Sequence, residues 1–118
     1  MSPVICAGAL SSIKYLRSEH GVELRQQHQN RAKRLKKILK HKNINMIENE
    51  THIVPVLVGD PVRCKQISDT LLNDHNIYVQ PINYPTVPQG TERLRFAPTP
   101  MHSNAMISDL AERLEEVL

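Results

Sequence analysis

Residues that mark specialised protein classes are scarce in this chain. Among its 118 residues there is no Trp and one Phe, so aliphatic side chains must fill most of the core. The two cysteines, Cys6 and Cys64, form no CxxC pair. This spacing argues against a cysteine metal site and predicts reduced thiols in an intracellular protein. Only four Gly are present, and no glycine-rich pattern that cradles phosphate is formed.

Long apolar runs and a strong net charge are missing as well. The segment "IVPVLV" is far too short to span a bilayer, and the start lacks the charged region of a signal peptide. A net charge of +3 does not by itself imply nucleic acid. With 40% apolar and 23% charged residues, the composition is typical of a soluble globular protein. We expect one compact domain, residues 1–118, with no membrane partner.

The periodicity of apolar residues predicts four helices and three strands. The predicted elements, in chain order, are a helix over 4–19, a break at Gly21, a helix over 22–41, a strand over 52–59, a helix from 60, strands over 77–82 and 92–97, and a helix over 103–117. This order favours an α+β fold: a small antiparallel sheet of about three strands, covered on one face by helices. The leading helices would span 1–42 and the sheet-and-helix core 52–118.

Local signals support several of these elements. Asp60 is a typical N-cap and the following Pro suits a first helical position, so a helix should begin there, with Ile67, Leu71 and Leu72 facing inward. Pro55 places the first strand at an edge of the sheet or at a bulge. The second helix is very polar and carries one narrow apolar stripe, formed by Leu24, His28, Ala32, Leu35 and Leu39.

Three other patterns are candidates for functional sites. The basic run "RAKRLKKILKHK" at 31–42 has no interleaved aromatic residue, and its charges surround the helix outside the apolar stripe. A solvated helix face is therefore favoured over a nucleic-acid site. The six histidines are scattered without zinc-ligand spacing, so no metal site is expected. A buried structural role is favoured for cysteine over a nucleophilic one.

The stretch "NYPTVPQGTERLRF" at 83–96 is the most informative part of the chain. Pro85 and Pro88 fix the backbone at their positions, and Gly90 allows a turn before the strand. A loop of this kind loses little entropy when it binds a ligand, so Thr86 at its tip is a candidate hydroxyl donor.

The strand that follows carries two arginines. A period of two places Arg93 and Arg95 on one face and Leu94 and Phe96 on the other. A guanidinium on a strand suits a planar carboxylate, because two parallel hydrogen bonds fix both orientation and charge. The alternative is a pair of arginines on the solvent side of an edge strand, where they deter aggregation. The pattern alone favours the solvent-side reading, because paired surface arginines are common on edge strands, and it does not choose between the two arginines.

The amino-acid sequences of three segments resemble those of a known protein family. "HIVPVLVGDP" and "IYVQPINYPTVPQGTERLRFAPTPMH", with the opening "SPVICAGALSSIKYL", resemble the C-terminal domain of the 5-aminolevulinate synthases. These belong to the α-oxoamine synthase family of pyridoxal-phosphate enzymes, of fold type I. The resemblance covers nearly the whole chain. Asn83–Tyr84 before the loop and Thr91–Glu92 after it favour this branch over its sister enzymes, which share the loop and the R-x-R strand.

The resemblance also implies roles for individual residues. Arg95 is similar to the arginine that binds the carboxylate of glycine, and Thr86 to the threonine that contacts the succinyl carboxylate of the acyl-CoA. No role follows for Arg93. Gln89 departs from the family, which often has a basic residue at that point of the loop.

The resemblance further implies a fragment of a larger enzyme. No lysine here has the context of the family's Schiff-base lysine, so no catalytic residue is expected in this chain, and the large domain that binds pyridoxal phosphate would lie outside it. The full enzyme would be a homodimeric acyltransferase that condenses glycine with succinyl-CoA, releasing CoA and CO2 and yielding 5-aminolevulinate for haem synthesis. It would reside in the cytoplasm of a bacterium or the mitochondrial matrix of a eukaryote. Another α-oxoamine synthase, an amino-acid-binding regulatory domain and a nucleic-acid adaptor remain the alternatives.

Overall fold

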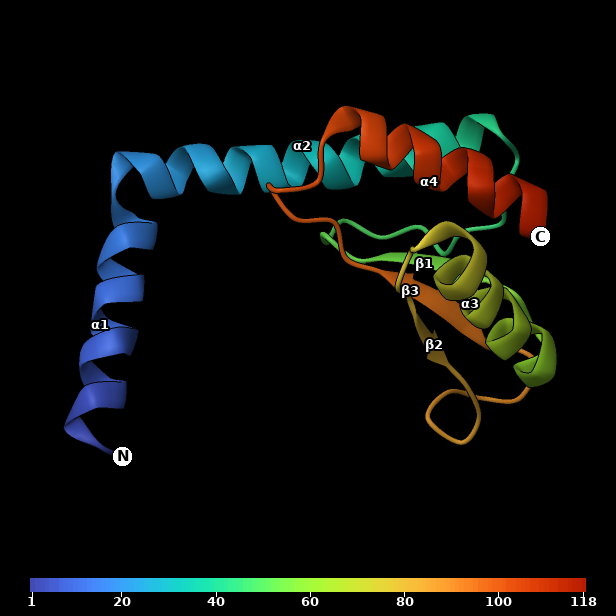
Figure 1. Ribbon diagram of the computed structural model, residues 1–118, viewed down its shortest axis with the longest axis horizontal. Coiled ribbons are helices and arrows are strands. Elements are labelled where there is room, and N and C mark those ends of the chain that lie inside the picture. The colour runs from blue at the N-terminus through green and yellow to red at the C-terminus, as the bar shows by residue number, and fades with distance from the viewer.

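The computed structural model describes all residues, 1–118, and has the predicted order of elements (Figure 1). Four helices accompany one antiparallel three-stranded sheet, which confirms the predicted α+β fold. The elements are α1 (Pro3–Arg17), α2 (Glu19–His41), β1 (Val54–Leu57), α3 (Pro61–His75), β2 (Gln80–Ile82), β3 (Arg93–Phe96) and α4 (Asn104–Val117).

The corner between α1 and α2 lies at Ser18, three residues earlier than the break predicted at Gly21. Ser18 caps α2, because its hydroxyl accepts a hydrogen bond from the Gly21 backbone N–H at 3.3 Å. Gly21 lies inside the first turn of α2 and is buried. A Cβ at this position would lie 2.2 Å from the carbonyl oxygen of Leu16. Gly21 therefore serves close approach between the two helices, and a capping serine determines where the chain turns.

The sheet is antiparallel and has three strands, as the sequence predicts. The strand order is β1-β3-β2. Pro55 lies in an edge strand, where a missing backbone N–H is tolerated, and this confirms the expectation for β1. β3 is the central strand and pairs with both neighbours, so Arg95 lies opposite Pro55 on one side and opposite Gln80 on the other. The alternative in which the two arginines occupy an edge strand is therefore wrong.

Helices cover one face of the sheet, as predicted. Leu94 and Phe96 of β3 point into this layer and are almost fully buried, whereas Arg95 on the opposite face is exposed. One apolar cluster joins the sheet to helices α2, α3 and α4; its members are Leu35, Leu39, Val54, Val56, Cys64, Ile67, Leu71, Val79, Leu94, Phe96, Ile107, Ala111 and Leu114. Because α2 supplies two of these side chains, the segment 1–42 and the segment 52–118 share this core.

Helix α3 begins as predicted but turns one apolar residue outward. The carboxylate of Asp60 accepts a hydrogen bond from the Arg63 backbone N–H at 2.8 Å, which confirms the predicted N-cap. Ile67 and Leu71 are buried, whereas Leu72 is 46% exposed, so its inward placement was wrong. Residues four apart lie on the same face of a helix, and Leu72 falls one residue beyond the face that Ile67 and Leu71 define.

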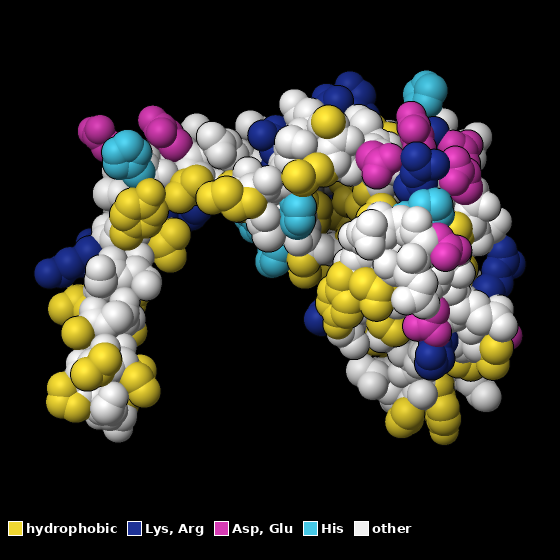
Figure 2. Space-filling view, viewed as in Figure 1, with side chains coloured by type: hydrophobic (Ala, Val, Ile, Leu, Met, Phe, Trp, Pro, Cys, Tyr) yellow, Lys and Arg dark blue, Asp and Glu magenta, His cyan; other side chains and the backbone are white.

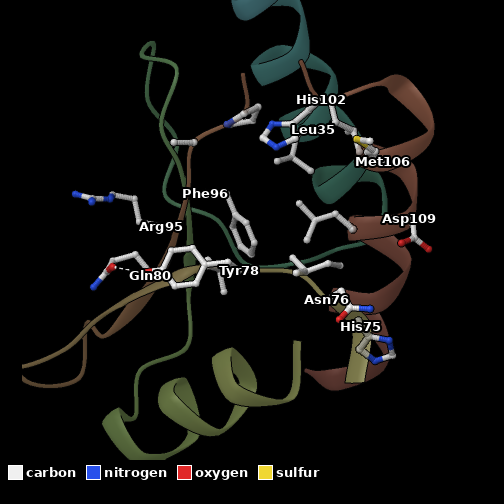
Figure 3. Close-up of a pocket in the computed structure, with 16 residues that line it drawn as sticks. Leu35, His75, Asn76, Tyr78, Gln80, Arg95, Phe96, His102, Met106 and Asp109 are labelled. Atoms are coloured by element: carbon white, nitrogen blue, oxygen red, sulfur yellow. Dashed lines mark hydrogen bonds between the residues drawn. The ribbon is translucent and has the colours of Figure 1, made fainter. Parts of the chain in front are cut away.

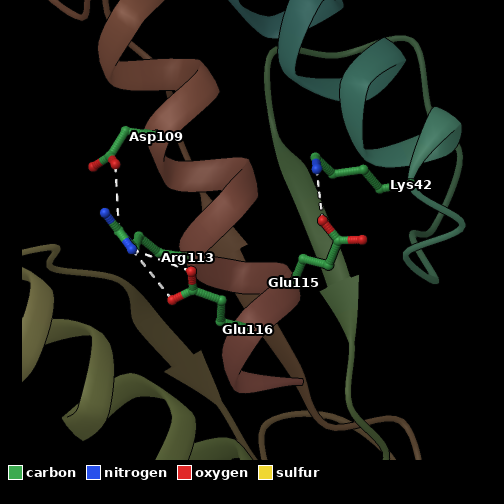
Figure 4. A network of polar contacts seen from close by, with 5 residues as sticks. All are labelled: Lys42, Asp109, Arg113, Glu115 and Glu116. Atoms are coloured by element: carbon green, nitrogen blue, oxygen red, sulfur yellow. Dashed lines mark hydrogen bonds and ion pairs between the residues drawn. The ribbon is translucent and has the colours of Figure 1, made fainter.

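Polar contacts occupy much of the basic segment at 31–42. Lys42 at the end of α2 forms an ion pair of 2.6 Å with Glu115 of α4, and this hydrogen bond raises the pKa of Lys42 (Figure 4). In the same network, Arg113 pairs within α4 with Asp109 and Glu116. Further contacts within the chain are made by Arg31, Lys36 and Lys40. These contacts favour the surface reading of the basic run over a nucleic-acid site.

Helix α1 projects away from the rest of the molecule (Figure 1). It contacts only α2 and contains no buried residue. Figure 2 shows apolar side chains along this projecting helix; the exposed ones are Val4, Ile5, Leu10, Ile13, Tyr15 and Leu16. None of the helices combines the length and the apolar character that crossing a membrane requires.

Candidate functional site

Arg95 lies at the centre of the uncovered face of the sheet. Its side chain is exposed, and it forms no hydrogen bond or ion pair with any residue of the chain. Arg93 lies on the same face but is half-buried, and its Nε donates to the Thr91 carbonyl oxygen at 3.0 Å. The backbone of Arg95 is held on both sides by strand pairing. The guanidinium of Arg95 is therefore attached to a backbone with little freedom to move, and all of its N–H donors are free to bind a ligand.

A cavity of about 800 Å³ lies beside Arg95, where the end of α3, β2, β3 and α4 meet. The ring of Phe96 points into this cavity, whereas Arg95 points away from Phe96 on the other side of β3 (Figure 3). Tyr78 Oη donates to Gln80 Oε1 at 2.9 Å next to Arg95. Just over half of the residues that line the cavity are hydrophobic, and Arg95, His102 and Asp109 are among the polar ones.

The loop between β2 and β3 carries Thr86 at an exposed position. The Thr86 backbone N–H donates to the Asn83 carbonyl at 2.9 Å, which closes the first turn of the loop. At the other end, the backbone N–H and the hydroxyl of Thr91 both donate to the Pro88 carbonyl, at 3.0 and 2.6 Å. The Thr86 hydroxyl makes no hydrogen bond in the chain. It does not line the cavity beside Arg95, so the two predicted site residues do not share one pocket within this chain.

A group of polar side chains is buried where this loop joins the sheet. Glu92 is fully buried, and neither carboxylate oxygen has a hydrogen-bond partner. Asn83, at the other foot of the loop, has a buried and unpartnered Oδ1. The thiol of Cys64 lies close by: burial raises its pKa, and the charge of Glu92 adds to that shift. In the sequence Glu92 served only as a mark of resemblance, although alternation along the strand places it on the same face as Leu94 and Phe96.

The fold assembles no metal site from the histidines, cysteines and acidic residues. No group of three such side chains comes together. His28 and His52 are brought close, with ring centroids 4.8 Å apart, although they are distant in the sequence. Cys64 is buried and Cys6 is exposed. The expected structural placement of a cysteine is confirmed for Cys64.

Lys36 is the lysine most tightly held by the chain. Its Nζ donates to the carbonyl oxygens of Asn49 and Thr51 and to Asn49 Oδ1. Partial burial lowers its pKa, but three oxygen acceptors surround the ammonium group. Lys36 therefore joins α2 to the segment before β1 and is not free for covalent chemistry.

Sequence relatives match almost the whole chain. A 5-aminolevulinate synthase of Cereibacter sphaeroides is 52% identical over 115 residues, which are 98% of this chain and 28% of the relative. The 5-aminolevulinate synthase of Rhizobium meliloti is 53% identical over 117 residues, with 99% and 28% covered. The resemblance read from the motifs is thus confirmed. The chain spans just over a quarter of the length of these curated relatives.

Solved structures agree in fold. A serine palmitoyltransferase from S. paucimobilis with bound PLP superposes with a TM-score of 0.80 at 27% identity, covering 91% of this chain and 27% of that one. The 8-amino-7-oxononanoate synthase of Francisella tularensis superposes with a TM-score of 0.82 at 19% identity, covering 98% and 33%. These matches confirm the expected fold, the small domain of a fold-type-I enzyme.

One family model accounts for nearly the whole chain. The model described as aminotransferase class I and II matches residues 1–114. This match includes the helical pair, the sheet with Arg95 and most of α4. The chain belongs to the aminotransferase class I and II family.

Proposed function

We propose that this chain is the C-terminal domain of a 5-aminolevulinate synthase, an acyltransferase that joins glycine to succinyl-CoA with release of CoA and CO2. The proposal rests on one observation about Arg95: this residue lies in the central strand, and no residue of the chain pairs with its guanidinium. Relatives of that name at about half identity support the assignment. The complete enzyme would be a homodimer, cytoplasmic in a bacterium or in the mitochondrial matrix of a eukaryote.

In this proposal Arg95 binds the carboxylate of glycine. A planar guanidinium forms two parallel hydrogen bonds with a carboxylate, which fixes the orientation of a small amino acid that has few other groups to hold. Strand pairing with Pro55 and Gln80 limits the movement of the Arg95 backbone. A fixed orientation of the bound substrate lowers the entropic part of the reaction barrier.

Thr86 is proposed to recognise the acidic end of the succinyl group. Its hydroxyl is exposed and free to donate a hydrogen bond, and the turns at both ends of the loop limit the loss of entropy on binding. Because Thr86 and Arg95 line no common cavity within this chain, the proposal requires surfaces outside it to complete the pocket.

The residues of this chain do not fit the role of holding pyridoxal phosphate. A Schiff base needs a lysine that can lose its proton at the reacting centre, whereas the Nζ of Lys36 is bound to three oxygen acceptors. The other lysines lie within helices or, for Lys42, at the end of α2. We therefore assign the cofactor, pyridoxal 5'-phosphate, to the remainder of the enzyme, and substrate recognition to this chain.

The glycine assignment is tested by Arg95→Lys in the complete enzyme. One ammonium cannot replace the two-pronged guanidinium, and a hydrogen bond to a charged group contributes about 1.5–3 kcal/mol, so the KM for glycine should rise about 10- to 100-fold. Arg93→Lys is the matched control, since Arg93 already donates to Thr91 within the chain. Steady-state kinetics with varied glycine measure both. An unchanged glycine KM in the Arg95→Lys enzyme would refute the assignment.

The acyl-CoA assignment is tested by Thr86→Val, which removes the hydroxyl and keeps the shape. Loss of one hydrogen bond of about 1 kcal/mol should lower the preference for succinyl-CoA over uncharged acyl-CoAs about fivefold in kcat/KM. Thr70→Val on α3 makes the same chemical change outside the loop. Equal preferences before and after the Thr86 exchange would count against this role.

Calorimetric titration of the chain alone with glycine separates this proposal from an amino-acid-binding regulatory domain. A recognition surface that other parts of the enzyme complete should bind glycine too weakly to measure. Saturable binding to the isolated chain, lost in Arg95→Lys, would favour the regulatory alternative.

A further inference from the structure

The buried carboxylate of Glu92 has no role in the proposal above. Its backbone is firmly held, because its carbonyl oxygen accepts the N–H groups of Val58 and Gly59, each at 2.9 Å. Its side chain lies on the helix-covered face with Leu94, two residues on, and is 0% exposed. Both carboxylate oxygens are nevertheless without a hydrogen-bond partner. A charged group placed in this way requires a donor nearby.

Asn83 is the side chain placed to supply that donor. β2 and β3 pair with Ile82 opposite Arg93, and one further step of this antiparallel register sets Asn83 opposite Glu92. Oδ1 of Asn83 is also buried and unpartnered, while its Nδ2 makes one contact of 3.5 Å with the Pro61 carbonyl. That contact is at the outer limit of a hydrogen bond.

Turning the Asn83 amide over would give the Glu92 carboxylate the donor that it lacks. The amide oxygen and nitrogen have nearly the same shape, so the turn places two N–H donors where Oδ1 lies. It gives up the long contact to Pro61 and sets Oδ1 toward the Pro61 carbonyl oxygen. No basic side chain competes for the acid: Glu92 takes part in no ion pair, and Arg93 lies on the opposite face of β3. From α3, the titratable group facing it is the thiol of Cys64.

We propose that Glu92 and Asn83 form a hydrogen-bonded clamp that closes the base of the loop at 83–92 and so positions Thr86. The two residues are the feet of this loop, and Thr86 lies between them. Arg95 depends less on the clamp, because strand pairing on both sides already holds it. This role rests on the proposed function for its effect on substrate, whereas the closure of the loop rests on the strand register and on the two buried, unpartnered groups.

The clamp is tested by exchanging its partners. Asn83→Asp sets two carboxylates against each other and should open the loop. The double variant Asn83→Asp with Glu92→Gln restores an amide–carboxylate pair with the roles reversed, and Glu92→Gln alone retains a donor for Asn83 Oδ1. Asn30→Asp on the exposed side of α2 is the matched control for the added charge.

Hydrogen–deuterium exchange of the substrate-free complete enzyme is the first measurement. Backbone amides of 83–92 should exchange about tenfold faster in Asn83→Asp and return to the wild-type rate in the double variant. Kinetics are the second measurement: the KM for succinyl-CoA should rise more than the KM for glycine in Asn83→Asp, with recovery in the double variant.

Three outcomes would overturn the clamp. These are unchanged exchange in Asn83→Asp, a double variant no better than that single variant, and equal changes in the two KM values. If Asn83→Asp does not fold, recovery of folding in the double variant supports the clamp and failure of both variants refutes it. A wild-type enzyme without synthase activity would contradict the proposed function. The exchange measurement would still test the clamp in that case, because it does not depend on activity.

Discussion

At the scale of single residues, burial separates side chains of the same type. Cys64 lies in the core between α3 and the sheet, whereas Cys6 lies on the exposed surface of α1. Arg95 and Arg93 differ in a similar way, since only Arg93 has a partner within the chain. The chemical behaviour of each residue therefore follows from its surroundings.

Cys64 should make stability fall at alkaline pH. Burial raises the pKa of Cys64 in the folded chain above the ordinary value of 9.0. The unfolded chain therefore releases this proton at a lower pH than the folded chain does. As the pH rises above about 9, this difference lowers the free energy of unfolding. The contribution is complete below that pH and declines by at most about 1.4 kcal/mol per pH unit. Urea unfolding between pH 8 and 10 measures this slope.

The matched variants for this prediction are Cys64→Ala and Cys6→Ala. Cys64→Ala should flatten the alkaline slope relative to the wild type, whereas Cys6→Ala, on an exposed helix, should retain it. The ion pair of Lys42 loses strength only above pH 10.5, outside the measured range. Equal slopes in the wild type and in Cys64→Ala would show that the thiol is not responsible.

At the scale of elements, the corner between α1 and α2 depends on one glycine. The first turn of α2 passes so close to Leu16 that a Cβ on Gly21 would overlap the backbone of that residue. A backbone contact cannot be relieved by rotating a side chain. The angle between the two helices therefore requires Gly at this position.

Gly21→Ala should destabilise the helical corner, and Gly8→Ala should do the opposite. The added methyl group at Gly21 meets Leu16 and should cost the packing of α1 on α2 about 1–3 kcal/mol, as overpacking does, while the rest of the chain keeps its stability. Gly8 lies inside α1 with nothing within 4 Å of an added Cβ, so the exchange there should stabilise helix α1 by about 0.5–1 kcal/mol. Circular dichroism during thermal unfolding distinguishes the two. A Gly21→Ala chain that loses the helical signal of α1 at the same temperature as the wild type would contradict this account.

At the scale of the whole molecule, an extended helix adjoins a compact body. The radius of gyration is 16.6 Å, compared with about 13.5 Å for a compact chain of this length. The difference comes from α1, which projects from the end of α2 (Figure 1) and contributes no residue to the core. The stability of the body should therefore be nearly independent of α1.

Removal of residues 1–17 tests this independence. Since the core cluster lies within α2, α3, α4 and the sheet, the free energy of unfolding should change by less than about 0.5 kcal/mol. Urea unfolding followed by circular dichroism measures it, with Leu35→Ala as the control that should cost about 2–5 kcal/mol. A loss in the truncated chain as large as in Leu35→Ala would contradict the separation.

Local chemistry alone determined much of this protein. Period-two alternation was enough to place Arg95 on the other face of the strand from Leu94 and Phe96. The cap at Asp60 was enough to predict the start of α3. Both signals act between neighbouring residues. The motif around Thr86 and Arg95 was also enough to identify the family. The roles of these two residues remain predictions.

Contacts between distant segments decided the rest. The central position of β3, the outward turn of Leu72 and the burial of polar groups of Glu92 and Asn83 depend on how strands and helices pack. The corner at Ser18 was missed because Gly21 looked like a break, although it permits a close crossing. Sequence fixes the preferences of each segment, and the packing of segments against one another determines which side chains lose contact with water.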